Sequence, residues 1–468
     1  MRGEKGHMSL NLGEYLASLQ GKRVAVVGVG ISNTPLLKLL LEAGISVTAC
    51  DKKEEAQFGP LAGELRDMGA ELAFGSQYLD CLDHDVIFRS PGIRPDLPAF
   101  LRAQEKGSLL TSEMEVFFDV APCPIIGVTG SDGKTTTTTL IAELLKNAGH
   151  TVHVGGNIGT PLLAKAPEMK LEDYAVLELS SFQLMTLRKS PHIAVVTNLS
   201  PNHLDIHTSM DEYRQAKENL FLHQGPEDVV IFNHDNEETL SMAARAPAKR
   251  VFFSRSPLER GVFVEDGMIV ISDEKEKRPI ISTTDILIPG QHNVENYLAA
   301  IAAVEGLVSR EVIEKTAKTF PGVEHRIELV RTLGGVRYYN DSIASSPTRT
   351  IAGLRSFDQK LILIAGGYDK KIPFDVLGEE ICRRVKSVIL TGHTAEKIRE
   401  SILAAPNYTE DTPEIMMADS FQEAVLAAYR KAQPGDVVIL SPACASFDHF
   451  PNFAERGRTF KTIVNNLP

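Results

Sequence analysis

The sequence predicts an α/β protein with more than one domain, and three observations support this fold class. Short apolar runs typical of buried strands alternate with segments of helical periodicity along the chain. Several of these runs end in glycine-rich or polar loops, which is where open parallel sheets bind ligands. The chain has 468 residues, and at about 100–200 residues per domain this length predicts two to four domains.

The composition excludes several classes of protein. Apolar residues make up 43% of the chain, enough for sizeable cores, and the net charge of −12 argues against nucleic acid as the main partner. The five cysteines are scattered and form no C-x-x-C pair, which predicts a reducing, cytoplasmic location and no structural zinc site. No apolar run approaches about 18 residues, so no membrane span is expected. Residues 1–7 lack the apolar core of a signal peptide and are interpreted as an added segment, with Met8 as the natural start.

The first region opens with a strand predicted at residues 22–27 and a glycine turn after it. The motif is G-x-G-x-x-N from Gly28, with Asn33 where a dinucleotide-binding fold carries a third glycine. A helix follows, and a second strand at 46–49 leads to Asp51, the position at which such folds contact a ribose. This pattern favours a nucleotide-binding fold without indicating which nucleotide.

A third strand, predicted at residues 85–88, runs into a Ser-Pro-Gly-Ile loop at 90–93. A loop at the carboxyl end of a strand is a candidate ligand site in an open α/β sheet. The alternative is an ordinary turn.

The second region contains a phosphate-loop pattern. Residues 125–128 predict a buried strand, GSDGKT follows at 130–135, and apolar residues at helical spacing come next. In such a loop, glycines let backbone N–H groups close on phosphate oxygens, a lysine reaches the β and γ phosphates, and a hydroxyl holds Mg²⁺. The last two roles fall on Lys134 and Thr135. The first glycine of the full pattern is replaced by Val128, and the alternative is a strand-to-helix turn with a surface lysine.

Further polar residues of this region are candidate site residues. Glu178 interrupts an apolar strand, so its carboxylate needs a partner; a metal near the phosphate loop is one, and the alternative is a glutamate that faces solvent. His203 and Asp205 follow a buried strand, as site residues tend to, although a lone histidine is usually structural. Lys217 lies on a helix predicted at 211–222 and, taken alone, is interpreted as a solvated lysine.

The third region begins near residue 322. Apolar strands at 361–365, 387–391 and 437–440 each end in a small, polar loop, which predicts another α/β sheet with a ligand edge. Arg326 is a single basic residue between regions, and its alternative role is a surface salt bridge.

Taken together, these stretches resemble the Mur ligases of peptidoglycan synthesis, and within that family the branch that adds D-glutamate. The resemblance covers nearly the whole chain from about Leu10. Its motifs are TGSDGKT at 129–135, GNIG at 156–159, LELSSFQ at 177–183, NHLD at 202–205, YRQAK at 213–217, GQHN at 290–293 with Asn296, HR at 325–326, NDS at 340–342 and LSPACAS at 440–446. The Asp-Asn-Pro-Arg motif expected of the diaminopimelate- or lysine-adding relatives is absent.

The resemblance implies three domains: a Rossmann-like UDP-substrate domain at residues 1–111, a central P-loop ATPase-type α/β domain at 112–322, and a Rossmann-like amino-acid-binding domain at 323–468. It implies a cytoplasmic monomer that uses ATP and Mg²⁺ to join D-glutamate to UDP-N-acetylmuramoyl-L-alanine in cell-wall synthesis. The substrate carboxylate is phosphorylated, and the amine attacks the acyl phosphate to give amide, ADP and phosphate. Two negative reactants must meet, so charge neutralisation and exclusion of water fit this chemistry.

The resemblance also implies roles residue by residue. The implied catalytic residues are Lys134, His203 and Lys217. The ATP-binding positions are Gly130, Ser131, Asp132, Gly133, Lys134, Thr135, Thr136, Asn296, Arg326 and Asp341. The UDP-substrate positions are Ile31, Ser32, Asp51, Lys52, Ser90, Gly92, Asn157, Ser180 and Gln183, the last three nearer the muramoyl-alanine end. The D-glutamate positions are Ser345, Lys370, Ser446 and Phe453. The metal ligands are Thr135, Glu178, His203 and Lys217, the lysine being carbamylated in this family and so carboxylate-like.

One position departs from the pattern of this family. Some relatives carry lysine after Asp-Ser, where this chain has Ile343, so that charge is missing or comes from Lys370 or Lys371. The loop at 368–371 also differs from the commoner glycine-rich version, which leaves Lys370 as one of two neighbouring candidates.

Three other functions compete with this interpretation. A nicotinamide-dependent oxidoreductase would use Gly28, Gly30 and Asp51, but it leaves the phosphate loop and the last third of the chain unexplained. A non-catalytic protein would bind nucleotide without turnover. Folylpolyglutamate synthase is the runner-up among related ligases, and the ligand-binding N-terminal domain is not expected of it.

Overall fold

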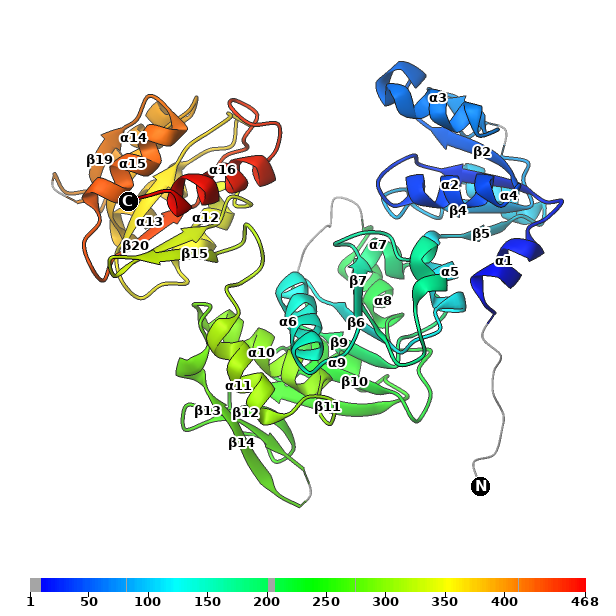
Figure 1. The fold of residues 1–468 in the computed structure, drawn as a ribbon, viewed down its shortest axis with the longest axis horizontal. Helices are drawn as coiled ribbons and strands as arrows, with labels where there is room; N and C mark the ends of the chain where they lie inside the picture. Colours follow the sequence, from blue (N-terminus) through cyan, green and yellow to red (C-terminus); the bar gives the residue numbers. More distant parts are fainter. Residues whose placement is uncertain (1–9, 81, 201–206, 274, 411) are drawn as a thin grey trace. The chain divides into compact units, whose positions relative to one another are not determined.

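The computed structural model describes residues 10–80, 82–200, 207–273, 275–410 and 412–468. The chain divides into two compact units, Met1–Thr283 with Glu295–Thr316, and Thr284–Val294 with Ala317–Pro468. Three mostly parallel sheets (Figure 1), each built from one continuous stretch, confirm the predicted α/β class with three sheet-based parts. The exact domain boundaries stay a prediction. In the part of the chain that the structure describes, every helix is too short or too polar to cross a membrane.

The first sheet has the strand order β3-β2-β1-β4-β5 and is parallel throughout. Its strands are β1 Arg23–Val27, β2 Ser46–Asp51, β3 Glu71–Phe74, β4 Val86–Arg89 and β5 Leu109–Thr111. The accompanying helices are α1 Leu12–Ser18, α2 Asn33–Glu42, the 3-10 helix η1 Glu55–Phe58, α3 Pro60–Asp67, α4 Pro98–Glu105 and α5 Glu113–Val120. Val24 and Val26 of β1 face one core, and Ala25 and Val27 face the other, so the sheet is covered on both sides. The order reverses between β1 and β4, which brings the loops after these two strands together.

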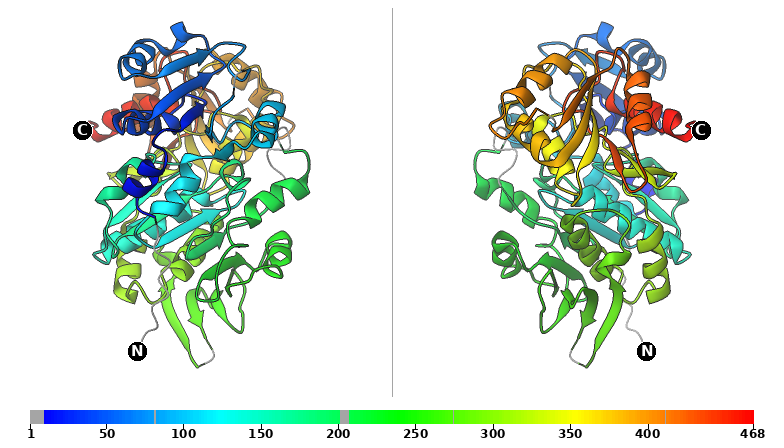
Figure 2. Two further views of the ribbon diagram at one scale, coloured as in Figure 1. Left: turned by 90° about the vertical axis from the view of Figure 1, so that its right-hand side faces the viewer. Right: turned by 90° about the vertical axis from the view of Figure 1, so that its left-hand side faces the viewer.

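The second sheet, also in the first unit, has the order β14-β13-β12-β11-β10-β9-β6-β8-β7. Its strands are β6 Ile125–Thr129, β7 Val152–Gly156, β8 Tyr174–Glu178, β9 Ile193–Val196, β10 Val229–Asn233, β11 Lys249–Ser254, β12 Gly261–Glu265, β13 Met268–Ser272 and β14 Lys277–Ser282. Strand β13 pairs antiparallel with β12 and with β14, and these strands lie toward the bottom of both views in Figure 2. Strand β6 lies between β9 and β8, so the phosphate loop after β6 has the ends of both strands beside it.

The helices that follow the first sheet along the chain differ in length and in the unit they belong to. They are α6 Lys134–Asn147, η2 Leu163–Glu168, α7 Ser181–Leu184, α8 Met210–Glu218, α9 Glu237–Ala243, η3 Thr283–Asp285, α10 Gln291–Ala303 and α11 Arg310–Thr319. The chain passes between the two units three times, after Thr283 in η3, within α10 and within α11. Strand β9 ends at Val196, and the side chains of Thr197 and Asn198, which follow it, contact the phosphate loop.

The third sheet lies in the second unit and has the order β15-β16-β20-β17-β18-β19. Its strands are β15 Glu328–Leu333, β16 Val336–Asn340, β17 Leu361–Ala365, β18 Val385–Leu390, β19 Glu414–Met417 and β20 Val437–Leu440, and β15 pairs antiparallel with β16. Helices α12 Pro347–Leu354, α13 Asp375–Arg384 and α14 Ala395–Leu403 cover one face, and α15 Phe421–Lys431 and α16 Phe453–Asn465 cover the other. The loops after β17, β18 and β20 therefore meet at one edge, as the sequence predicts, and the loop after β16 lies at the same edge.

Candidate functional site

The phosphate loop connects β6 to α6 and is shaped by two glycines with positive φ. Gly130 has φ 149° and Gly133 has φ 79°. A Cβ at Gly130 would lie 2.0 Å from Thr197 Oγ1, and one at Gly133 would lie 2.5 Å from Asn296 Oδ1. Both positions therefore exclude a side chain for conformational and steric reasons. The close approach also brings Asn296, a predicted nucleotide contact, against the loop.

Lys134 is the first residue of α6 and folds back over the loop. Its Nζ donates to the carbonyl oxygens of Gly130 and Ser131, each at 2.9 Å. The ammonium thus lies above the turn, where the amino end of α6 adds positive potential. A cation and a helix start at one place make a site for phosphate oxygens.

Two residues that the sequence interpretation missed hold this loop from the neighbouring strand. Asn198 Oδ1 accepts from the Asp132 N–H at 2.9 Å, and Thr197 Oγ1 donates to the Asp132 carbonyl at 2.6 Å. Both residues follow β9, which pairs with β6. The rule that site residues follow parallel strands was the available signal for them.

Thr135 and Glu178 contact each other beside the phosphate loop. The Thr135 hydroxyl donates to Glu178 Oε2 at 2.7 Å, and the Asn157 amide donates to Glu178 Oε1 at 2.7 Å. The Glu178 residue is only 2% exposed, so the solvent-facing alternative for it is wrong. The predicted metal ligands Thr135 and Glu178 are brought together. Asn157, predicted to contact the muramoyl end, points its amide at the same carboxylate.

This donor set fits a hard cation. Hydroxyl and carboxylate oxygens are the ligands that Mg²⁺ prefers, and the Thr135 and Asn157 donors that hold the buried Glu178 carboxylate are both neutral. Among the described residues, no group of three His, Cys, Asp or Glu side chains is arranged to hold a metal. His203, the other predicted ligand, and Asp205 lie outside the described residues.

Lys217 is buried, so the interpretation of it as a solvated lysine is wrong. It lies on α8 and is 1% exposed. Its Nζ donates to the Gly130 carbonyl at 2.8 Å and to Thr129 Oγ1 at 3.3 Å, and it lies 4.7 Å from the centre of the Tyr213 ring. Burial, and then the nearby Lys134 ammonium, lower the pKa of the Lys217 amine well below its ordinary value of 10.5.

The predicted UDP-site residues of the first sheet meet at the switch point between β1 and β4. The Asp51 carboxylate accepts from the backbone N–H of Val29 at 2.7 Å and of Lys53 at 3.0 Å. Gly28 approaches the Ser90 loop so closely that a Cβ would lie 2.6 Å from Ser90 Cβ. The remaining predicted residues of this set, on the same loops, are Ile31, Ser32, Lys52 and Gly92, and Ile31 is 85% exposed.

Ser180 and Gln183 form a capping box at the start of α7. Ser180 Oγ accepts from the Gln183 N–H, and Gln183 Oε1 accepts from the Ser180 N–H at 3.0 Å. Both residues therefore have a local structural role beside the predicted contact with the muramoyl end. Of the other predicted ATP residues, Ser131 and Thr136 are buried in the loop and in the first turn of α6.

The second unit carries the two remaining predicted ATP residues. Asp341 follows β16 and is buried, with Ser441 Oγ donating to its Oδ2 at 2.7 Å. Burial raises the pKa of Asp341 to about 7, and the Arg326 charge opposes this rise from nearby. The structure thus brings Arg326 close to Asp341.

The predicted D-glutamate residues follow three strands of the third sheet and open α16. They are Ser345 after β16, Lys370 after β17, Ser446 after β20, and Phe453 at the first position of α16. Two hydrogen bonds connect these loops: the Tyr368 N–H donates to the Ala445 carbonyl at 2.9 Å, and the Ser342 hydroxyl donates to the Phe453 carbonyl at 2.7 Å.

Arg456 on α16 is a residue that no sequence motif indicated. Its guanidinium is buried and donates to Ser342 Oγ, to the Ser342 carbonyl, and to the carbonyls of Cys444 and Ala445, at 2.9 to 3.0 Å. It therefore joins the loops after β16 and β20. At the unusual Ile343, the carbonyl accepts from Arg349 at 3.4 Å, so Arg349 joins Lys370 and Lys371 as a cation near this loop cluster.

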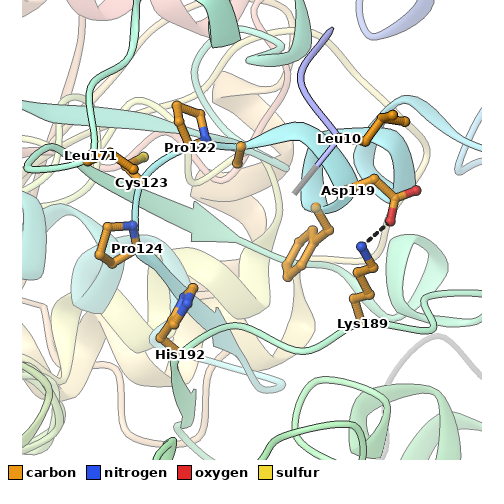
Figure 3. A pocket seen from close by; sticks show the side chains of 10 residues that line it. Leu10, Asp119, Pro122, Cys123, Pro124, Leu171, Lys189 and His192 are labelled. Atoms are coloured by element: carbon orange, nitrogen blue, oxygen red, sulfur yellow. Dashed lines mark ion pairs between the residues drawn. The ribbon is translucent and has the colours of Figure 1, made fainter. Parts of the chain in front are cut away.

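A hollow of the first unit is a separate feature. It has a volume of about 850 Å³ and is lined mostly by apolar side chains, with an ion pair of 2.5 Å between Asp119 and Lys189 (Figure 3). Pro124, which lines it, immediately precedes β6. The hollow is therefore at the amino end of this strand, opposite to the phosphate loop.

Comparison with known proteins places these observations in a family. The model of the Mur ligase middle domain matches residues 128–304, and that of the Mur ligase glutamate ligase domain matches residues 325–444. The chain is 53% identical over 465 residues to the UDP-N-acetylmuramoylalanine--D-glutamate ligase of Acetivibrio thermocellus, and 49% identical over 462 residues to the protein of that name from Clostridium novyi. Each match covers 98% of this chain and 100% of the relative.

Solved structures agree in fold. The UDP-N-acetylmuramate-alanine ligase of Thermotoga maritima is similar with a TM-score of 0.55 at 19% identity, over 95% of this chain and 99% of the other. A UDP-N-acetylmuramoyl-L-alanyl-D-glutamate--2,6-diaminopimelate ligase is similar with a TM-score of 0.56 at 18% identity, over 95% and 93%. The family models together cover more than half of the chain, and the sequence relatives match along their full length. This chain therefore belongs to the Mur ligase family.

Proposed function

We propose that this protein is an ATP-dependent ligase that joins D-glutamate to UDP-N-acetylmuramoyl-L-alanine in the synthesis of peptidoglycan precursors. The observation that carries the proposal is the match along the full length of relatives that bear this name. The geometry supports it independently, because Lys134, Thr135 and Glu178 meet at one edge of the second sheet, as transfer of a phosphoryl group requires.

The first step is phosphorylation of the substrate carboxylate. A carboxylate oxygen attacks the γ phosphorus of ATP, the bond to the bridging oxygen breaks, and ADP leaves with an acyl phosphate formed. The backbone N–H groups of the loop and the amino end of α6 would bind the phosphates. Lys134 would exchange its contacts with the Gly130 and Ser131 carbonyls for phosphate oxygens, lowering the repulsion between two anions.

Mg²⁺ is the metal that this chemistry and these donors suit. Thr135 and Glu178 would hold it, and when bound it supplies positive charge at the transferring phosphoryl group. Asn157 orients the Glu178 carboxylate through its 2.7 Å contact. Carboxylate orientation of this kind usually matters for metal affinity.

Lys217 is proposed to act as a carbamate. Only a neutral amine adds to CO₂, and the lowered pKa of Lys217 keeps more of its amine neutral at physiological pH. As an ammonium it donates to Gly130 O and Thr129 Oγ1; as a carbamate it would be an anionic oxygen ligand beside the phosphate loop. The role of His203 with it stays a prediction from the family resemblance.

The second step is attack of the D-glutamate amine on the acyl phosphate. The neutral amine forms a bond to the carbonyl carbon, a tetrahedral intermediate collapses, phosphate leaves and the amine loses a proton. The loops that carry Ser345, Lys370 and Ser446, with the start of α16 at Phe453, are proposed to bind the two carboxylates. Arg456 holds two of these loops in place through its four hydrogen bonds.

The proposed setting follows from the same interpretation. A ligase acting on a nucleotide-linked precursor would work in the cytoplasm, and we propose a monomer, as the family resemblance implies. Sedimentation of the protein at micromolar concentration tests whether it is a monomer, since a dimer would show twice the monomer mass.

The test of the function is phosphate release from ATP with defined substrate pairs. UDP-N-acetylmuramoyl-L-alanine should be combined with D-glutamate, L-glutamate, D-alanine or L-lysine. We expect turnover with D-glutamate and strong rejection of D-alanine, because a pocket built for two carboxylates leaves its own polar groups unpaired with a smaller ligand. Preference for D-alanine or L-lysine would show that the protein is another member of the family.

A further inference from the structure

Arg89, the last residue of β4, is a buried cation whose hydrogen bonds determine the shape of the loop after it. The residue is 1% exposed. Its Nη1 donates to the carbonyl of Ile93 at 2.7 Å and to those of Ser90 and Pro91 at 3.3 Å each. Three carbonyls of one short loop thus converge on one guanidinium, and this is the loop that carries the predicted UDP contacts Ser90 and Gly92.

The other end of the same guanidinium reaches the second sheet. Arg89 Nη2 donates to the Phe182 carbonyl of α7 at 3.4 Å and to Thr186 Oγ1 at 3.1 Å. Thr186 in turn donates to Glu115 of α5 at 3.2 Å. Helix α7 begins directly after Ser180, a predicted contact of the muramoyl end. A single side chain therefore joins the loop predicted for the nucleotide end of the substrate to the helix predicted for its other end.

Arg94 makes a second tie, five residues further along the chain. Its two Nη atoms contact the Glu212 carboxylate of α8 at 2.7 and 3.2 Å, and its Nε and Nη2 contact Asp96. Glu212 also accepts from the Thr208 N–H at 2.7 Å. Helix α8 carries the buried Lys217. The loop after β4 is therefore connected to α7 through Arg89 and to α8 through Arg94.

Simple packing does not explain this arrangement. A buried guanidinium without a carboxylate in hydrogen-bond contact costs free energy unless its donors are satisfied, and an apolar side chain would cover the same surface at lower cost. Five directional contacts, in contrast, fix both the shape of the loop and its position against α7. Arginine is suited to this because its planar fork presents several donors at set angles.

We propose that Arg89 and Arg94 are positioning residues that hold the UDP-binding loop in register with the phosphate loop. The inference rests on the proposed function. The proposed substrate is bound at its nucleotide end by the first sheet and reacts at its carboxylate beside the second sheet. Binding energy at one end helps the reaction at the other only if the distance between them is fixed. A misplacement of about 1 Å can cost about 100-fold in rate.

The test compares Arg94→Gln, Glu212→Gln and Arg89→Gln with Arg66→Gln as a matched control. Arg66 is an exposed arginine of the same sheet region, paired only with Glu55 in the described contacts. With saturating substrates, we expect kcat to fall about 10-fold or more in Arg94→Gln and Glu212→Gln, with KM for ATP and the calorimetric Kd for UDP within about twofold of wild type. Arg89→Gln should in addition weaken UDP binding, because the loop itself loses its shape.

A double variant of Arg94 and Glu212 tests whether the two residues act through their shared contact. If Arg94 acts through Glu212, Arg94→Gln with Glu212→Gln should lose no more kcat than either single variant, because both remove the same contact. Arg94 and Glu212 are only partly buried, so their variants keep the test available even if Arg89→Gln does not fold. Unchanged kcat in the Arg94 and Glu212 variants would overturn the inference, as would a parallel loss of kcat, UDP affinity, ATP affinity and thermal midpoint.

Phosphate release by the wild-type protein distinguishes failure of this inference from failure of the proposed function on which it rests. Absence of phosphate release by wild type with UDP-N-acetylmuramoyl-L-alanine and D-glutamate would overturn the proposed function and the inference with it. Normal turnover by wild type, together with variants that match the Arg66→Gln control, would overturn the inference alone.

Discussion

The Thr135 hydroxyl lies 2.7 Å from the Glu178 carboxylate, although the two residues are 43 positions apart in the chain. They meet because β6 and β8 are paired with Val128 opposite Glu178, which places the start of α6 over the end of β8. Glu178→Gln removes the negative charge, while its amide oxygen can still accept from Asn157 and its NH₂ can donate to the Thr135 hydroxyl. We expect the apparent affinity for Mg²⁺ to fall about 10- to 100-fold, measured by metal titration of phosphate release.

Thr135→Ser is the matched control for that experiment, because it keeps the hydroxyl that contacts Glu178. It should stay close to wild type, whereas Thr135→Val should weaken Mg²⁺ binding like Glu178→Gln. A normal Mg²⁺ dependence of Glu178→Gln would show that this carboxylate is only a partner of Thr135 and Asn157.

Lys134 is expected to act mainly in the transition state of phosphoryl transfer. Lys134→Ala should lower kcat about 10²- to 10³-fold, as loss of one key electrostatic group does. The thermal midpoint should change little, since the ammonium contacts carbonyls of the loop at a partly exposed site. Lys146→Ala, at the exposed end of the same helix, is the control. Near-normal ligation by Lys134→Ala would contradict the phosphate-loop assignment.

Lys217 connects the activity to dissolved CO₂ and to pH. Its lowered pKa means that the amine is neutral over more of the physiological range and becomes protonated only as the pH falls. We expect activity to drop in CO₂-depleted buffer, to return with bicarbonate, and to decline on acidification. A ¹³C resonance of a carbamate after exposure to labelled CO₂ would report the modification directly.

Variants of Lys217 give an independent check. Lys217→Ala should abolish ligation, and Lys217→Glu should retain a trace by supplying a carboxylate. If Lys217→Ala ligates at the normal rate, the buried lysine has a structural role only.

Recognition of D-glutamate is predicted to depend on the loops of the third sheet. Ser446→Ala and Lys370→Ala should raise KM for D-glutamate with little change in KM for ATP, because each removes a donor for a substrate carboxylate. Lys371→Ala serves as the comparison, since the two lysines are neighbours. An unchanged KM in Ser446→Ala would mean that the amino acid binds elsewhere, and a larger effect of Lys371→Ala would reverse the assignment of the two lysines.

Asp341 should make stability fall as the pH rises. Burial raises its pKa to about 7 from an ordinary value of 3.8, so the folded protein binds a proton that the unfolded chain releases between these values. The contribution of this group to stability is complete below about pH 4 and is lost as the pH rises through about 7. Relative to wild type, the thermal midpoint of Asp341→Asn should therefore increase from pH 4 to pH 8. A constant difference between the two proteins would contradict the raised pKa.

Local patterns predicted most of the secondary structure around the site. The strand at Ile125–Thr129, its glycine turn and α6 follow from hydrophobic runs and from glycines at fixed offsets, which act over a few residues. The strand predicted at 361–365 matches β17, because a fully buried strand of a parallel sheet is apolar at every position. The ends of elements depend on contacts outside the local pattern, as where β9 ends and Thr197 and Asn198 turn to the phosphate loop.

The sequence by itself determined the α/β class, the phosphate loop and the family, because each depends on residue types at short, ordered spacings. Tertiary structure alone decided the rest of the site. Lys217 has the spacing of a solvated helix residue, and only packing of α8 against the phosphate loop buries it and lowers its pKa. Arg89 belongs to no motif and gains its role from acceptors about 90 residues away. Burial and long-range hydrogen bonds are properties of the assembled sheets, and no local pattern encodes them.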